Sequence, residues 1–438
     1  MRLCIKGGLI LNPATNLMGV GDLWISRDQI ATLDMERESY GMIPPGNLEG
    51  VTVIDATGKL VVPGFIDLHV HLREPGFTEK ETIETGSEAA ARGGFTTICC
   101  MPNTSPAIDS TEVLDYISWK VAKNNGVRVL PVAAMSLGQE GKELAPLNEM
   151  AEYSGPWSRM LGKGICGISE DGKSLADARL ALDAMKMAKE LSLPVFSHAE
   201  DPALPGSALG EALMMARDIR LAKEAGCRLH FCHVSTAEGV ELIREARKQG
   251  LPVTGETAPH YFTLTEQDGK GNPDFKMNPP LRTEKDREGI IEGLKDGTLS
   301  AIATDHAPHT REDKAGGYEK AANGIVGLET SFSLGYTYLV EKGRLELMEL
   351  VERMTRGPAE ILGIPAGDIS PGRVADVVVM DVEQPFQVDR EQFASKGRNT
   401  PFEGWPLFGK ALFTIAEGRI VWQAPEGNGL IREGEENR

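Results

Sequence analysis

Between residues 56 and 363, eight short apolar runs alternate with longer amphipathic stretches, and this alternation limits the folds open to the chain. The runs are rich in Val, Ile, Leu and Cys without regular polar positions, which is typical of parallel strands covered on both faces. Stretches such as 175–192 and 235–250 fit the helices that connect such strands. Eight consecutive βα units predict an α/β fold of the TIM-type (β/α)8 barrel class. The runs span residues 60–70, 96–102, 127–135, 164–169, 193–200, 228–234, 251–258 and 299–307.

The two ends of the chain differ from this central region. Residues 1–55 and 366–438 hold short strand-like pieces separated by Gly, Asn and Pro. Neither end has enough strands to bury a core alone. We therefore expect both ends to pair into one small composite β domain that flanks a barrel spanning residues 56–365.

Composition excludes several classes of function. The 438 residues include 46 basic and 64 acidic ones, a net charge of −18, with no basic run. This balance argues against nucleic acid or an anionic membrane as the partner and favours a small-molecule substrate. The chain has no leader-like start, no apolar stretch approaching 18 residues and no C-x-x-C pair among its six cysteines. We expect a cytoplasmic protein with reduced thiols.

Polar residues gather at one end of the predicted strands, the carboxyl end, where barrels build their active sites. His69 and His71 are two residues apart, so a strand would present both imidazoles on one face. Imidazole and carboxylate ligands suit zinc and similar divalent metals. The residues at or just past strand ends are His69, His71, Asn103, His198, His233, His260 and Asp305.

Three further positions have open interpretations. Asp171 follows the fourth strand, where its carboxylate could bridge two metals, but Asp-Gly also favours a plain turn. Arg73 follows His71 by two residues and could bind a substrate carboxylate bidentately. His309, four residues past Asp305, could donate to an anion.

The run PGFIDLHVHLREPG, with MPNTSP, GISEDG, SHAED, CHVST, NPPLR, TDHAPHT and GIVGLET in that order, resembles dihydroorotases of the type I group in the amidohydrolase superfamily. The resemblance extends from about residue 2 to 422. It implies zinc, two ions per chain, with one ion on His69, His71 and Asp305, the other on His198 and His233, and Asp171 bridging. It implies substrate contacts from Arg73, Asn103, Asn278, His309, Asn323 and Gly324.

The resemblance also implies a reaction, the reversible cyclisation of N-carbamoyl-L-aspartate to L-dihydroorotate and water in de novo pyrimidine biosynthesis. In the ring-opening direction a metal-activated water attacks the cyclic amide, with Asp305 as general base and then general acid. The remaining histidines, His230, His260 and His306, are assigned supporting positions. We expect a homo-oligomer, and association with aspartate transcarbamoylase stays open.

Two alternatives compete with this reading. Hydantoinases and allantoinases bridge their metals with a carboxylated lysine in the fourth strand, and the run 164–169 contains no lysine. A non-catalytic dihydroorotase-like subunit that scaffolds aspartate transcarbamoylase would lose metal ligands, whereas this chain keeps all six candidates. The sequence therefore favours an active dihydroorotase.

Overall fold

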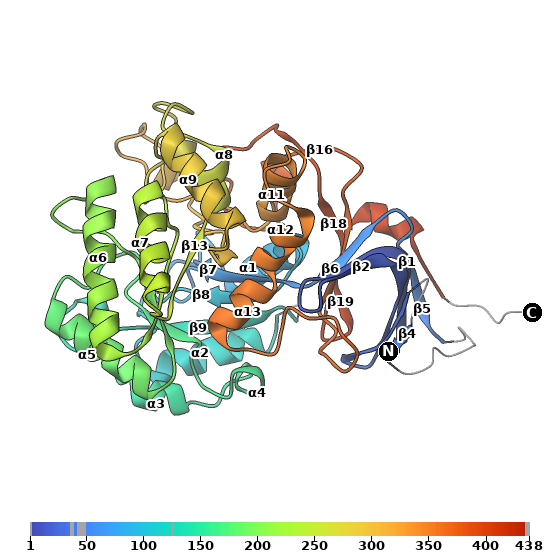
Figure 1. Ribbon diagram of the computed structural model, residues 1–438, viewed down its shortest axis with the longest axis horizontal. Helices are drawn as coiled ribbons and strands as arrows, with labels where there is room; N and C mark the ends of the chain where they lie inside the picture. Colours follow the sequence, from blue (N-terminus) through green and yellow to red (C-terminus); the bar gives the residue numbers. More distant parts are fainter. Residues whose placement is uncertain (1, 36–38, 42–49, 125, 434–438) are drawn as a thin grey trace, which may run out of the picture.

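Eight strands form a parallel sheet that curls into a barrel, as the sequence predicts (Figure 1). The computed structural model describes residues 2–35, 39–41, 50–124 and 126–433. The sheet runs from β7 to β14 in chain order, and the His71 amide donates to the His306 carbonyl at 2.8 Å where its two edges meet. The strands are β7 Phe65–Val70, β8 Phe95–Cys100, β9 Arg128–Ala134, β10 Gly167–Ser169, β11 Pro194–Ser197, β12 Arg228–Phe231, β13 Val253–Thr257 and β14 Ala301–Ile302.

Each of the eight predicted runs contains one barrel strand, but the first run is divided between two sheets. Its first part is β6, Leu60–Pro63, which pairs with strands outside the barrel. Gly64 separates β6 from β7, and a Cβ at this position would lie 2.3 Å from Thr96 Oγ1 on the neighbouring strand. Glycine is therefore required where the chain crosses from one sheet to the other.

Helices cover the outside of the barrel (Figure 1). Helix α7 illustrates how the sequence sets them: the Thr236 hydroxyl accepts from the Gly239 amide at its start, and Val240 and Ile243 are buried against the sheet. None of the described helices is long and apolar enough to span a membrane. The longer helices are α1 Ile83–Arg92, α2 Thr111–Val121, α5 Ala178–Glu190, α6 Ala208–Ala225, α7 Ala237–Lys248, α9 Glu284–Lys295, α12 Leu347–Met354 and α13 Arg356–Leu362, and the shorter ones are α3 Leu147–Glu152, α4 Ser158–Leu161, α8 Pro259–Thr263, α10 Arg311–Lys314 and α11 Ser331–Gly335.

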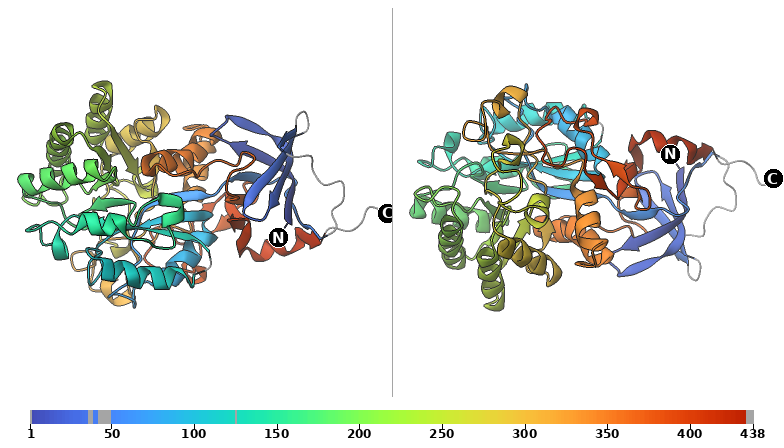
Figure 2. Two further views of the ribbon diagram at one scale, coloured as in Figure 1. Left: turned by 90° about the horizontal axis from the view of Figure 1, so that it is seen from below. Right: turned by 90° about the horizontal axis from the view of Figure 1, so that it is seen from above.

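Both ends of the chain contribute to one mixed sheet beside the barrel, as predicted (Figure 2). Strand β1 pairs with β2 antiparallel and with β5 and β6 parallel, while β15 joins β6 to the C-terminal strands. The domain boundaries stay a proposal, and β6 would place the first one near residue 64. The strands are β1 Arg2–Asn12, β2 Leu17–Ser26, β3 Gln29–Met35, β4 Ser39–Gly41, β5 Thr52–Asp55, β6 Leu60–Pro63, β15 Val377–Asp381, β18 Lys410–Ala416, β19 Arg419–Gln423 and β20 Ile431–Glu433, with the separate pair β16 Phe386–Gln387 and β17 Pro406–Leu407.

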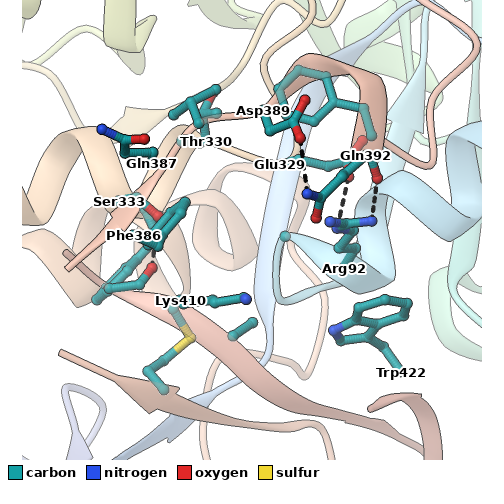
Figure 3. A pocket seen from close by; sticks show the side chains of 18 residues that line it. Arg92, Glu329, Thr330, Ser333, Phe386, Gln387, Asp389, Gln392, Lys410 and Trp422 are labelled. Carbon is teal, nitrogen blue, oxygen red and sulfur yellow. Dashed lines mark hydrogen bonds and ion pairs between the residues drawn. The ribbon is translucent and has the colours of Figure 1, made fainter. Parts of the chain in front are cut away.

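The barrel and the β domain meet at a small cavity beside the end of α1 (Figure 3). Arg92 of α1 lies between Glu329 and Trp422: its Nε is 3.1 Å from Glu329 Oε2, and its guanidinium sits 5.4 Å above the indole ring. It also donates to the Gln392 carbonyl. Burial raises the pKa of Glu329 to about 7 even though Arg92 lowers it. Arg92, from a barrel helix, thus contacts both the barrel residue Glu329 and the β-domain residue Trp422.

Candidate metal centre and substrate pocket

The six predicted metal ligands come together at the carboxyl ends of five barrel strands, all of them buried. The parallel sheet brings these ends to one face, so residues far apart in sequence become neighbours. Only His69 lies within a strand, and the others follow their strands by one to three residues. The six are His69 in β7, His71 after β7, Asp171 after β10, His198 after β11, His233 after β12 and Asp305 after β14.

Asp171 lies at the centre of this cluster. Its Oδ1 is 3.3 Å from His69 Nε2, 3.3 Å from His198 Nδ1 and 3.6 Å from His233 Nε2. Its other oxygen, Oδ2, lies 3.5 Å from His71 Nε2. The carboxylate therefore faces both predicted groups of histidines at once, which is the arrangement that a bridging ligand requires.

Asp305 faces the same nitrogen atoms of the β7 histidines. Its Oδ1 lies 3.2 Å from His71 Nε2 and 3.6 Å from His69 Nε2. The three side chains form one of the groups whose ligand atoms all lie within 4.8 Å of one another. They are the three residues that were predicted to share one ion.

The electrostatics of the cluster fit a cation. Burial alone would lower the pKa of His69, but the Asp171 charge raises it well above its usual value. Burial alone would raise the pKa of Asp171, yet the histidines lower it far below its usual value. A neutral imidazole lone pair cannot face a carboxylate at 3.3 Å unless a proton or a metal ion lies between them. Neither His69 ring nitrogen has a well-aligned hydrogen bond, so the donor set suits a divalent metal.

Two of the candidate ligand histidines have a hydrogen-bond acceptor beside their outer ring nitrogen, the one that does not face Asp171. His71 Nδ1 lies 2.8 Å from Asn103 Oδ1, and His198 Nε2 lies 3.3 Å from Glu200 Oε2. An acceptor there requires the hydrogen on the outer nitrogen, which leaves the inner nitrogen free for a metal. Sequence reasoning missed Glu200, although an acid two residues after a ligand histidine was a visible signal.

A cavity of about 210 Å³ opens above the cluster. Every predicted substrate residue lines this cavity, and so do five of the six candidate ligands. The sixth, His69, is fully buried and does not reach the cavity. Asn278 lies at its edge, where its Nδ2 donates to Glu200 Oε2 at 3.1 Å. The predicted substrate residues on the cavity wall are Arg73, Asn103, Asn278, His309, Asn323 and Gly324.

Arg73 supplies positive charge to this cavity. Its Nε donates to the Pro308 carbonyl at 3.2 Å, and its Nη2 lies 3.3 Å from His309 Nε2. Burial and the Arg73 charge lower the pKa of His309 to about 3, so this imidazole is neutral. His309 Nε2 lies 2.8 Å from the Asn323 carbonyl. An anionic substrate group would therefore be recognised chiefly by the guanidinium.

Lys314 fixes the loop that carries Asn323 and Gly324, and sequence reasoning missed it. Its Nζ donates to the carbonyls of Lys276 at 3.2 Å, Ala322 at 2.9 Å and Gly324 at 2.9 Å. The side chain is largely buried. No local pattern could reveal these bonds, because all three acceptors are backbone atoms.

The backbone is left-handed at three site residues, with φ of 60° at Arg73, 37° at His233 and 49° at Asp305. Side chains other than Gly, Asn and Asp rarely adopt this conformation, and it costs of order 1–3 kcal/mol per residue. The strand ends turn sharply at these positions.

The three histidines assigned to support make no contact with Asp171. His306 Nε2 lies 3.2 Å from Glu81 Oε2, and His230 Nε2 lies 3.1 Å from Glu256 Oε2. The Nε2 atom of His260 has no hydrogen-bond partner among the described residues, and burial lowers the pKa of His260 to about 4. All three stand outside the ligand cluster.

Comparisons with known proteins show which families this chain resembles. A family model described as dihydro-orotase-like matches residues 58–209. Among solved structures, an L-hydantoinase from Arthrobacter aurescens is 25% identical with a TM-score of 0.83, covering 99% of this chain and 97% of its own. A D-hydantoinase is 26% identical with a TM-score of 0.82, covering 97% and 95%.

Curated relatives are considerably more similar in sequence. The dihydroorotase of Syntrophus aciditrophicus is 43% identical over 97% of this chain and 100% of its own length. Those of Pelotomaculum thermopropionicum and Bacillus cytotoxicus are 44% and 41% identical, each covering 97% of this chain and 99% of its own length. With this similarity along almost its whole length, the chain belongs to the dihydroorotase family.

Proposed function

We propose that this chain catalyses the reversible closure of N-carbamoyl-L-aspartate to L-dihydroorotate with release of water. The observation that carries the proposal is the position of Asp171, whose two oxygens face His69, His198 and His233 on one side and His71 on the other. The sequence relatives named dihydroorotase support the same reaction.

The proposed metal is zinc, with two ions per chain. His69, His71 and Asp305 would hold one ion, His198 and His233 the other, and Asp171 would bridge. Histidine nitrogen and carboxylate oxygen are ligands that zinc prefers. When bound, zinc polarises a carbonyl group and lowers the pKa of water toward about 7.

Asp305 is proposed to move the proton. Burial would raise its pKa, but His71 and His69 lower it, so the side chain is ionised and can accept. In the ring-opening direction Asp305 takes a proton from the attacking water as the carbon–oxygen bond forms. It then gives that proton to the ring nitrogen as the carbon–nitrogen bond breaks. Such general acid-base catalysis contributes roughly 10² to 10⁴ in rate.

Substrate binding is assigned to the groups on the cavity wall. Arg73 would pair with the substrate carboxylate, assisted by Asn103 and His309. Asn278 and the backbone at Asn323 and Gly324 would contact the remainder of the ring. This assignment explains how a protein with a net charge of −18 accepts an anionic substrate.

Hydantoinase or allantoinase activity is the competing proposal, and the solved structures of hydantoinases share the fold. The strand β10 contains no lysine that could be carboxylated, and Asp171 stands just past its end. The test is turnover of dihydroorotate, hydantoin and allantoin by one preparation whose metal content is measured. Preference for hydantoin or allantoin would refute the proposed reaction.

The third possibility is a non-catalytic dihydroorotase-like subunit that scaffolds aspartate transcarbamoylase. Such a subunit would lose metal ligands, whereas this chain has all six candidate ligands, so we do not favour it. The expected homo-oligomer, the association with aspartate transcarbamoylase and the cytoplasmic location remain predictions. Light scattering tests the first two. The mass of a single chain for the protein alone would contradict the homo-oligomer. Unchanged separate masses after mixing with the transcarbamoylase would contradict the association.

A further inference from the structure

A row of polar side chains, buried except for the half-buried Thr254 at its end, runs from His69 along the barrel strands behind the metal centre. Glu256 of β13 and His230 of β12 are almost completely buried, at 0% and 1% exposure. Neither contributes to the proposed ligand set or the substrate cavity. A buried carboxylate is costly unless its partners satisfy it, so its place beside a ligand histidine requires a reason.

The contacts along this row are continuous. Thr254 Oγ1 lies 2.9 Å from His230 Nδ1, His230 Nε2 lies 3.1 Å from Glu256 Oε2, and Glu256 Oε1 lies 3.3 Å from His69 Nδ1. The last distance is just beyond the usual range for an N–H to oxygen bond. Neither of these two atoms makes an aligned hydrogen bond with any described residue, so they face each other as a close polar contact.

The chemistry of these groups fixes where the hydrogens lie. An ionised carboxylate only accepts hydrogen bonds. Glu256 lies between the two imidazoles, with Oε2 toward His230 Nε2 and Oε1 toward His69 Nδ1, so a hydrogen on each facing nitrogen gives both oxygens a donor. Both imidazole nitrogens that face it must therefore carry hydrogen. For His69 this places the hydrogen on Nδ1 and leaves the Nε2 lone pair toward Asp171.

We propose that Glu256, itself held by His230, is a positioning residue that fixes the tautomer and ring orientation in which His69 presents Nε2 to the metal. The inference rests on the ligand set proposed above. A carboxylate behind a ligand histidine makes the imidazole more basic and holds its ring. Thr254 completes the row, since its hydroxyl can donate to the bare Nδ1 of His230.

Cys232 is the other group near this face of His69. Its sulfur, the Glu256 oxygen and a His69 nitrogen lie within 4.8 Å of one another. A neutral thiol is a weak acceptor, which leaves Glu256 as the group that orients the imidazole.

The first test compares Glu256→Gln with a matched control in the full-length protein. Glutamine has one acceptor oxygen and an amide that donates, so it cannot accept from both imidazoles at once. Zinc affinity, measured by competition with a chelator, should fall by roughly 10- to 100-fold. Glu329→Gln, which changes a buried carboxylate at the domain junction (Figure 3), should bind zinc as the wild type does. Equal affinities of the Glu256 variant and wild type would overturn the proposal.

A second pair of variants serves if Glu256→Gln does not fold. His230→Gln can still donate to Glu256, whereas His230→Leu cannot. We expect His230→Leu to bind zinc several-fold more weakly than His230→Gln. Nitrogen-15 NMR of histidine should show His69 protonated at Nδ1 in the zinc-loaded wild type. Equal affinities of the pair, or a His69 Nδ1 without hydrogen, would refute the role of Glu256.

A third variant separates this inference from the ligand set on which it depends. His69→Ala should lower the zinc content of the protein. If it does not, the proposed ligand set is wrong. If His69→Ala loses zinc while Glu256→Gln binds it normally, the ligand set stands and only the positioning role fails.

Discussion

Replacing Arg73 by alanine tests whether the guanidinium recognises the substrate carboxylate. Arg73 Nε is already used by the Pro308 carbonyl and Nη2 lies 3.3 Å from His309 Nε2, which leaves Nη1 and the second hydrogen of Nη2 for a ligand. Hydrogen bonds to a charged group contribute about 1.5–3 kcal/mol each. Two such bonds amount to roughly 3–6 kcal/mol, or about 10² to 10⁴ in kcat/KM.

The assay compares two substrates that differ only in the carboxylate, dihydroorotate and dihydrouracil. Arg73→Ala should lower kcat/KM for dihydroorotate by that factor and leave dihydrouracil turnover within roughly threefold of its wild-type value. Arg73→Lys keeps the charge but loses the planar fork, so its loss should be intermediate. Metal content must be equal in all three proteins.

An equal loss on both substrates would refute this reasoning. It would mean that Arg73, whose backbone is left-handed and whose guanidinium contacts the Asp305 loop, acts by shaping the centre and not by binding the carboxylate.

Three further predictions concern neighbouring residues. Asp305→Asn should lower kcat by roughly 10² to 10⁴ while dihydroorotate still binds, and near-normal turnover at equal metal content would remove Asp305 from proton transfer. Lys314→Met removes three hydrogen bonds from the 310–325 loop and should raise KM more than it lowers kcat; an unchanged KM would contradict the loop assignment. The pKa of His260 falls from 6.5 to about 4 on folding, so the unfolded chain binds the extra proton and stability is lost as pH falls from 6.5 toward 4. Urea unfolding at pH 7 and 4.5 should show a smaller acid loss for His260→Gln than for wild type, and equal losses would exclude this histidine.

The barrel could be predicted from the sequence because its strands are buried on both faces. This burial produces apolar runs that are visible without any knowledge of pairing. The candidate ligands could be predicted for a related reason, since parallel strands bring their carboxyl ends to one face. The division of residues 60–70 between β6 and β7 could not be predicted, because both pieces are fully buried strands and only Gly64 stands between them.

The residues behind the ligands were not predictable in the same way. Glu256 and His230 lie inside strands, and their contact depends on the register that sets His230 opposite Thr254. The sequence shows neither that register nor which face of each strand points inward. Glu200 was closer to being predictable, since it stands two residues after His198 in the same loop.

The place of Asp171 has a consequence for how the metal centre is assembled. A lysine can bridge two metals only after carbon dioxide has been added to it, so such a centre depends on the supply of bicarbonate as well as metal. An aspartate is ready as soon as the chain folds. With Asp171 as the bridge, the centre is fully encoded in the polypeptide, and its maturation depends on metal supply alone.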